Sequence, residues 1–151
     1  MPDQPLKLRR YAAADETAAI ELWRRTWQVA YPDIDFSARL DWWRTRWRDE
    51  LVPTCVITIV ERDGAMLGFV TVDPVTGYLD QIVVAPEAWG SPLAAALVVE
   101  AKRIAPNGVD LLVNQTNARA IRFYEKQGFV ITGADKNPLS GAPLHKMSWR
   151  P

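Results

Sequence analysis

Three apolar, β-branched runs follow one another closely between residues 54 and 84, and they constrain the fold more than any other feature of the chain. Tight turns separate them. Arg62-Asp63-Gly64-Ala65 has the composition of a two-residue hairpin loop, and Asp73–Gly77 is also rich in turn residues. Strands joined by such short turns must pair antiparallel. We therefore predict a meander of three strands, at Thr54–Glu61, Met66–Val72 and Tyr78–Val84.

Helical and strand-like patterns surround this meander. Periodic apolar residues predict one helix after Asp15 and a second after Ser37, both of which are plausible N-caps, and Pro32 ends the first helix. Beyond the meander, two helical segments alternate with apolar runs typical of strands. The remaining predicted elements are a strand at Leu6–Arg10, a helix at about Pro92–Ile104, a strand at Val109–Val113, a helix from Asn117 to about Gln127, and strands at Phe129–Thr132 and His145–Trp149.

This order is β-α-α-β-β-β-α-β-α-β-β. Hairpins followed by helical crossovers require both antiparallel and parallel neighbours. We therefore predict an α/β (α+β) fold with a mixed central sheet of about seven strands and helices on both faces. At 151 residues, without a repeat or a linker in the sequence, the chain fits one domain, residues 1–151.

Composition excludes several classes of partner. Eighteen basic residues balance eighteen acidic residues, so no net charge attracts nucleic acid or an anionic membrane. No apolar run reaches the roughly 20 residues needed to cross a bilayer, and the first residues lack the apolar segment of a signal peptide. One cysteine, Cys55, and one histidine, His145, are too few for a structural zinc site. We therefore expect a cytoplasmic protein that uses no metal and binds neither membrane nor nucleic acid.

Two segments carry most of the remaining information. Residues 117–129 read N-A-R-A-I-R-F-Y-E-K-Q-G-F, and residues 82–97 form a predicted strand, a loop and the start of a helix. The first segment resembles the C-terminal signature of the GNAT superfamily of N-acetyltransferases, N-x-x-A-x-x-x-Y-x-x-x-G-F, at every fixed position. The second resembles the acyl-CoA pyrophosphate loop of that superfamily, [Q/R]-x-x-G-x-[G/A]. The predicted order of elements is also the order of the family.

The resemblance implies an acyl-CoA-dependent N-acyltransferase with acetyl-CoA as co-substrate. The pantetheine arm would pair with the backbone of one strand, and the diphosphate would meet the N-terminus of the following helix. The loop departs from the family pattern, because Trp89 replaces Gln or Arg, and Pro92, which has no N–H, replaces the central Gly. The residues that the resemblance assigns to the coenzyme are Ile82, Val83, Val84, Trp89, Gly90, Ser91, Pro92, Leu93, Ala94, Asn117 and Tyr124.

The same resemblance suggests roles in catalysis. Tyr124 shares one face of its predicted helix with Asn117. The family's tyrosine at this position lies near the coenzyme sulfur, so Tyr124 would stabilise or protonate the departing thiolate. Some relatives carry a Glu base five residues before the motif Asn, but this chain has Leu112 there. Asp80, in the fourth strand, is the candidate base, and a chain of water molecules remains an equal alternative.

The acceptor is less constrained. The family builds its acceptor pocket largely from the first two helices, which places Trp27 and Tyr31 at the pocket wall. An aromatic-rich pocket and zero net charge favour a small, partly apolar primary amine over a protein.

The altered loop leaves a second interpretation open, a GNAT-fold protein that binds acyl-CoA or a partner without turnover. A nucleotide-phosphate binder is a weaker third, because the loop has one glycine and no following lysine. A homodimer is also left open.

Overall fold

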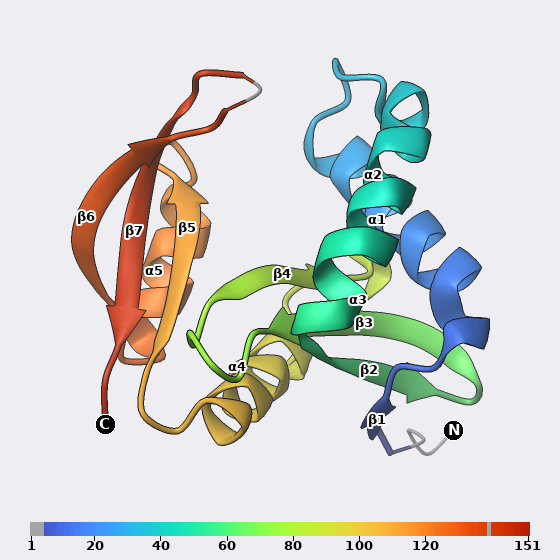
Figure 1. Cartoon of the computed structure of the whole chain (residues 1–151), viewed down its shortest axis with the longest axis horizontal. Coiled ribbons are helices and arrows are strands. Elements are labelled where there is room, and N and C mark those ends of the chain that lie inside the picture. Colours follow the sequence, from blue (N-terminus) through green and yellow to red (C-terminus); the bar gives the residue numbers. More distant parts are fainter. Residues whose placement is uncertain (1–4, 139) are drawn as a thin grey trace.

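The structure is a computed structural model that describes residues 5–138 and 140–151. Within these residues, seven strands and the helices between them follow the predicted order (Figure 1). The strands are β1 (Lys7–Arg10), β2 (Val56–Arg62), β3 (Ala65–Val72), β4 (Leu79–Val84), β5 (Val109–Asn114), β6 (Val130–Lys136) and β7 (Pro143–Trp149). The main helices are α1 (Glu16–Ala30), α2 (Leu40–Arg46), α4 (Leu93–Ile104) and α5 (Ala118–Lys126).

The strands form two antiparallel sheets rather than one continuous sheet. One has the order β1-β2-β3-β4 and the other the order β5-β7-β6. Among the described residues, one isolated parallel bridge, between Tyr78 and Asp110, joins them, and the Asp110 N–H donates to the Gly77 carbonyl at 3.0 Å. The predicted number and order of strands are confirmed. The parallel part of the predicted mixed sheet is reduced to this bridge, beyond which the two sheets separate.

Local signals explain the meander. At the β2–β3 turn both central residues have positive φ, with Asp63 at 52° and Gly64 at 75°. Two successive positive φ angles characterise the turn that best fits the twist of a hairpin, as the sequence predicted. In the β3–β4 pair the register shifts between Thr71 and Val72, because Gln81 lies opposite Thr71 and Leu79 lies opposite Val72. Asp80 is therefore the extra residue of a β-bulge.

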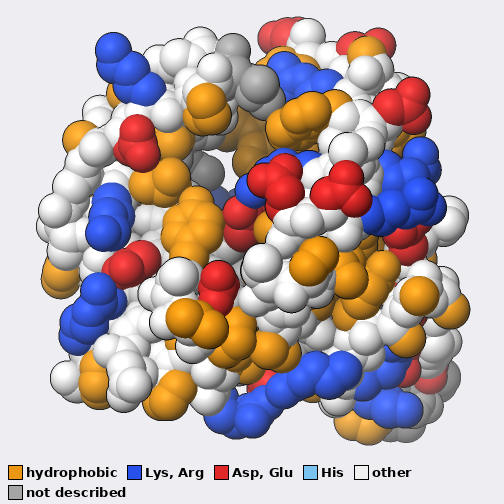
Figure 2. Space-filling model, viewed as in Figure 1, with side chains coloured by type: hydrophobic (Ala, Val, Ile, Leu, Met, Phe, Trp, Pro, Cys, Tyr) orange, Lys and Arg blue, Asp and Glu red, His pale blue; other side chains and the backbone are white. Residues whose placement is uncertain are grey.

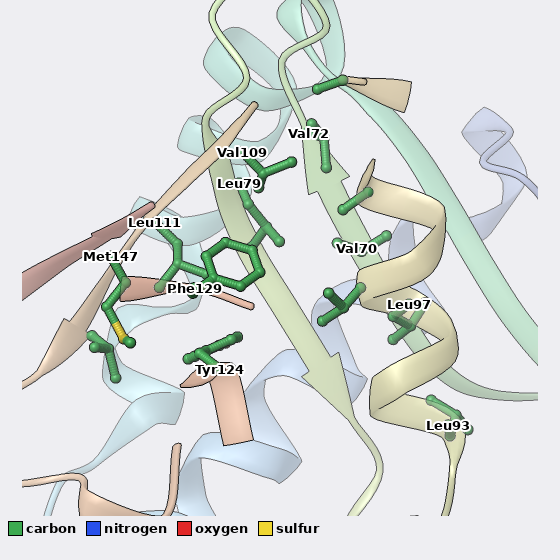
Figure 3. Close-up of a cluster of buried hydrophobic side chains, with 14 of the residues drawn as sticks. Val70, Val72, Leu79, Leu93, Leu97, Val109, Leu111, Tyr124, Phe129 and Met147 are labelled. Atoms are coloured by element: carbon green, nitrogen blue, oxygen red, sulfur yellow. The ribbon is translucent and has the colours of Figure 1, made fainter. Parts of the chain in front are cut away.

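Two apolar clusters cover the two faces of the larger sheet. On one face, Trp23 of α1 stacks on Trp43 of α2 with ring centroids 4.6 Å apart, and Trp47 meets Phe69 of β3 edge-on. On the other face, α4 and α5 pack in a cluster that draws on both sheets (Figure 3). Leu79 of β4 and Leu111 of β5 both belong to that second cluster, so side-chain packing continues across the point where backbone pairing ends.

Several predicted helix ends are corrected. Asp15 precedes α1, but its carboxylate accepts from Arg9 and from the Ala12 N–H and makes no capping bond. Asp35, and not Ser37, caps the turn Phe36–Arg39 that leads into α2, because its carboxylate accepts from the N–H groups of residues 37 and 38.

The start of β2 is corrected as well. A π-helical turn at Trp47–Leu51 and a short turn, α3 (Val52–Thr54), extend α2, so Thr54 is helical and β2 begins at Val56. The Cys55 N–H donates to the Leu51 carbonyl at 2.8 Å, which closes this last turn.

Candidate active site

The edge of β4 that faces β5 carries backbone groups that do not pair with β3. In an antiparallel strand, the N–H and C=O groups of successive residues point alternately to the two sides. The Ala85 N–H donates to Leu67 of β3 at 2.8 Å, and the Gln81 N–H donates to a β3 hydroxyl at 3.0 Å, so these odd-numbered residues face β3. The N–H and C=O groups of Ile82 and Val84 therefore point toward β5.

No strand of the described chain pairs with this edge beyond the Tyr78–Asp110 bridge. The opening between the two sheets consequently leaves the N–H and C=O groups of Ile82 and Val84 without strand partners in the described chain. An extended ligand that carries secondary amides could pair with them as an added strand would. The predicted coenzyme residues Ile82 and Val84 are thus placed at this edge by their backbone. Val83 is buried with its side chain among the aromatic residues of the α1–α2 face.

The loop after β4 leads directly into the N-terminus of α4. A short 3-10 turn, η4 (Pro86–Ala88), is followed by Gly90 at φ +80°, a conformation that favours glycine. The first intrahelical bond of α4 runs from the Ala96 N–H to the Pro92 carbonyl. The N–H groups of Ala94 and Ala95 therefore lack intrahelical acceptors and, with the helix dipole, favour an anion.

The residues at the start of α4 occupy other positions than the sequence predicted. Pro92 occupies the N-cap position and not the first helical position. The Ser91 hydroxyl donates to the Ala88 carbonyl at 2.6 Å and accepts from the Leu93 N–H at 3.3 Å. This hydroxyl is therefore engaged in holding the loop, which leaves the main-chain N–H groups at the start of α4 as the groups of this segment that are free to bind an anion.

Trp89 contacts the open edge of β4. Its indole Nε1–H donates to the Val84 carbonyl at 2.8 Å, while 41 % of the residue stays exposed. The acceptor of this bond is one of the main-chain groups that face the gap between the sheets. A ligand lying along β4 would therefore compete with the Trp89 side chain for the Val84 carbonyl.

Helix α5 carries two of the predicted residues, Asn117 and Tyr124. Asn117 caps the helix, because its side-chain oxygen accepts from the Ala120 N–H at 3.1 Å. Tyr124, 8 % exposed, lies in the cluster that includes the side chains of Ile82 and Val84, with its ring 5.7 Å from the ring of Phe129 (Figure 3). Burial raises the pKa of Tyr124 above its ordinary value, so its hydroxyl stays protonated at neutral pH.

Asp80 lies on the opposite face and is already paired. Its two carboxylate oxygens accept from the Arg46 guanidinium at 2.9 and 2.5 Å, and Oδ1 also accepts from the Gln81 side chain at 3.0 Å. The guanidinium lies over the Trp43 ring, 5.4 Å from its centroid. The Asp80 side chain is 11 % exposed, so this pair is largely withdrawn from water.

A hollow of about 410 Å³ opens beside this ion pair, and its walls include Arg46, Asp80, Tyr78 and Cys55. Burial raises the pKa of Tyr78 to about 12 and also raises the pKa of the Cys55 thiol. Both groups are therefore neutral at physiological pH. Figure 2 shows that the same face of the molecule is hollowed between the β5–β7–β6 half and the α1–α2 half, with hydrophobic and acidic side chains at the rim.

The predicted acceptor residues meet β5 across this face. Trp27 and Tyr31 stack at the end of α1, with ring centroids 5.5 Å apart and planes inclined by 15°. The Tyr31 hydroxyl accepts from the Asn114 side chain at 3.0 Å, which links α1 to the end of β5. Sequence reasoning missed Asn114 and Arg46. The alternation of β5 could have indicated Asn114, because Asp110, Leu112 and Asn114 share one face of the strand.

Across residues 5–138 and 140–151, no three His, Cys, Asp or Glu side chains gather as they would around a metal ion. Over the same residues, no helix combines the length and the apolar character that crossing a membrane requires.

Comparison with known proteins gives consistent matches. A model of the acetyltransferase (GNAT) family matches residues 17–129. The chain is 30 % identical to the peptidyl-lysine N-acetyltransferase YiaC of Escherichia coli (strain K12) over 146 residues, which cover 94 % of this chain and 95 % of that protein. It is 26 % identical to the peptidyl-lysine N-acetyltransferase YjaB of Salmonella typhimurium (strain LT2) over 145 residues, or 91 % of this chain and 92 % of that one.

Solved structures share the fold. The PaiA N-acetyltransferase of Thermoplasma acidophilum, solved in complex with coenzyme A, matches with a TM-score of 0.76 at 19 % identity, over 97 % of this chain and 99 % of that one. At this identity the likeness concerns the fold alone.

Proposed function

Because the chain belongs to the GNAT acetyltransferase family, we propose that it transfers the acetyl group of acetyl-CoA to the side-chain amine of a lysine in a peptide or protein. The chain is an N-acetyltransferase by family and by its relatives, and the co-substrate and the acceptor are the proposal. The observation that carries it is the unpaired edge of β4 at Ile82 and Val84, beside the start of α4 and Tyr124.

The acceptor part rests on the two sequence relatives, both of which are named peptidyl-lysine N-acetyltransferases. The preference for a small amine that composition suggested has no support among them. The zero net charge of the chain does not argue against a lysine acceptor, because a lysine side chain would interact with the charges near its binding cleft rather than with the net charge of the whole protein.

The coenzyme would lie in the gap between the two sheets. Its pantetheine amides would pair with the edge groups of Ile82 and Val84, and its diphosphate would meet the N–H groups of Ala94 and Ala95. For the arm to reach the Val84 carbonyl, the Trp89 indole has to leave it. Backbone groups would thus hold the coenzyme even though Trp89 and Pro92 depart from the family pattern.

Acyl transfer would then take place beside Ile82. The neutral amine attacks the thioester carbon, a C–N bond forms, and the carbonyl oxygen gains negative charge. The Ile82 N–H, which has no strand partner, would donate to that oxygen as an oxyanion donor. Collapse of the tetrahedral intermediate breaks the C–S bond and releases the amide and the coenzyme thiolate.

Tyr124 would stabilise the departing thiolate mainly by donating a hydrogen bond. An ordinary thiol has a pKa near 8.5, below that of a phenol, and burial raises the pKa of Tyr124 further. Complete transfer of the phenol proton to the thiolate is therefore unfavourable. A protonated hydroxyl nevertheless remains available to donate a hydrogen bond throughout the neutral pH range.

Asp80 is the proposed destination of the amine proton. Its oxygens already accept three hydrogen bonds, and an ionised carboxylate offers about four acceptor positions. One position is thus left for a water molecule that relays the proton of the lysine ammonium. In this scheme Arg46 fixes the orientation of Asp80.

A minimal acceptor tests the proposal. The wild-type protein is incubated with acetyl-CoA and Nα-acetyl-lysine N-methylamide, thiol release is followed, and mass spectrometry locates the new acetyl group. We expect acceptor-dependent thiol release and acetylation of Nε. Coenzyme binding in calorimetry without acetylation of any lysine acceptor would contradict the proposal and favour a member of the family that binds acyl-CoA without turnover.

A further inference from the structure

We infer that Tyr31 and Asn114 together recognise a main-chain amide next to the acceptor lysine, which makes them specificity residues for a peptide acceptor; this inference rests on the proposed function. The two residues belong to α1 and β5, and they are 83 positions apart in the sequence. The Asn114 Nδ2–H donates to the Tyr31 hydroxyl oxygen at 3.0 Å.

The pair lies at a height close to that of the reacting carbon. The two sheets are joined at Tyr78 and Asp110, and β4 and β5 run parallel from that bridge. Ile82 and Asn114 each lie four residues beyond it. Four strand residues of β5 span about 13 Å, and the bulge at Asp80 shortens the rise along β4 by about one residue, so the two positions lie at nearby heights on either side of the gap. Asn114 therefore stands across the gap from the region of the Ile82 N–H, which would hold the thioester oxygen.

The pair also lies on the face from which the acceptor would enter. The start of α4, where the coenzyme phosphates would bind, belongs to the cluster on one face of the larger sheet. Tyr31, at the end of α1, packs with the cluster on the other face. Coenzyme and Tyr31 would therefore approach the same gap from opposite sides.

The Tyr31 ring is held in place before any ligand arrives. It stacks on Trp27, and the Trp27 ring in turn contacts Phe36 with centroids 6.1 Å apart. Asn114 ends β5, and its carbonyl accepts from the Asn117 N–H at 3.0 Å, so its backbone is fixed by the cap of α5. A preorganised pair of this kind loses little conformational freedom when it binds a ligand.

The hydrogen-bonding capacity of the pair is only partly used. Within the described residues, the phenol proton of Tyr31 has no acceptor and the Asn114 Oδ1 has no donor. The pair thus offers two free donors, the phenol O–H and the second Nδ2–H, beside a free acceptor, the Asn114 Oδ1. Exchanging the nitrogen and oxygen of the Asn114 amide would exchange these roles and leave the same complement. A peptide amide supplies the matching C=O and N–H, whereas a simple alkylamine supplies neither.

The test compares two acceptors that differ only in the amides. Nα-acetyl-lysine N-methylamide carries the lysine side chain and its flanking amides, and n-pentylamine carries the same alkyl amine without them. We expect Tyr31→Phe and Asn114→Ala each to lower the ratio of kcat/KM for the lysine amide to kcat/KM for pentylamine about three- to tenfold, mainly through KM. The double variant should lose little more than either single variant.

Tyr11→Phe is the matched control. The Tyr11 hydroxyl also accepts one side-chain hydrogen bond, from Trp47 at 3.1 Å, within the same α1–α2 cluster. Its removal should leave the ratio of the two acceptors unchanged. Equal losses on both acceptors in Tyr31→Phe, or a wild-type protein that uses pentylamine as well as the lysine amide, would overturn the inference. A wild-type protein that binds coenzyme and acetylates neither acceptor would instead contradict the proposed function itself.

Discussion

The two faces of this molecule use different kinds of groups around the same gap. On the α4–α5 face, most groups available to a coenzyme are main-chain N–H and C=O groups at the edge of β4 and at the start of α4. On the α1–α2 face, side chains distant in sequence meet in pairs, Arg46 with Asp80 and Tyr31 with Asn114. Main-chain groups persist whatever side chain they carry, whereas a pair needs two correct residues. We therefore expect the α4–α5 face to tolerate substitutions that the α1–α2 face does not.

The largest effect should come from removing a main-chain donor. Ile82→Pro deletes the N–H that faces the gap without deleting a bond between β3 and β4, because that N–H points away from β3. We expect kcat to fall about 10²- to 10³-fold, as for the loss of one oxyanion donor. Ile82→Val keeps the N–H and should retain nearly full activity in the same thiol-release assay. Equal losses in both variants would show that the side chain, and not the backbone, matters here.

On the α4–α5 face, Tyr124 differs from the main-chain groups, because its proposed role depends on its side chain. Tyr124→Phe removes one hydroxyl and little volume, so the fold and the coenzyme affinity should persist. We expect kcat and kcat/KM to fall together about 10²-fold in an assay limited by chemistry, the lower end for acid assistance because a thiolate is a fair leaving group. Wild-type turnover by this variant would assign Tyr124 a purely structural role.

On the α1–α2 face, the pair of Arg46 and Asp80 can be tested by the stability of the protein. Arg46→Met removes the guanidinium that lies over the Trp43 ring and leaves Asp80, 11 % exposed, without its cation. We expect the free energy of unfolding to fall by about 2 kcal/mol in urea titrations. Arg48→Met is the control, because Arg48 pairs with Glu16 at the surface, where ion pairs contribute little to stability. Similar losses in both variants would mean that the Arg46 pair is no more than a surface contact.

The smallest predicted effect concerns Trp89. Trp89→Phe keeps an aromatic ring in the loop but releases the Val84 carbonyl from the indole N–H. Because the pantetheine arm would no longer compete for that carbonyl, we expect coenzyme A to bind about fivefold more tightly in calorimetry. Weaker binding by this variant would show that the indole contributes to the complex rather than opposing it.

The parts of the fold that depend on neighbouring residues could be predicted from the sequence. The turn at Asp63 and Gly64, the cap at Asn117 and the strand order all follow from local composition and spacing. Helix starts were harder where several polar residues compete. Asp35 caps the turn before α2 although Ser37 also had the right chemistry, since both lie within one helical turn.

The candidate site could be predicted only where a motif spans it. Residues 82–94 and 117–124 carry such motifs, and Tyr124 packs in the apolar cluster that the side chains of Ile82 and Val84 also contact. The pairing of Arg46 with Asp80 depends on a bulge that turns Asp80 toward α2, and the Tyr31–Asn114 bond depends on how α1 packs against the second sheet. Neither geometry is encoded by residues close in sequence, so composition and periodicity could not reveal it.

Because the two sheets of the described chain pair only at Tyr78 and Asp110, this bridge is the point about which one sheet would rotate relative to the other. Asn114 lies about 13 Å along β5 from the Tyr78–Asp110 bridge, so a rotation of about 5° between the sheets about this bridge would displace it relative to β4 by about 1 Å. A misalignment of that size can slow a positioned reaction about 10²-fold. Leu79 and Leu111 belong to the apolar cluster that continues across this bridge, so their packing would help to set how the groups on the two sides of the gap align.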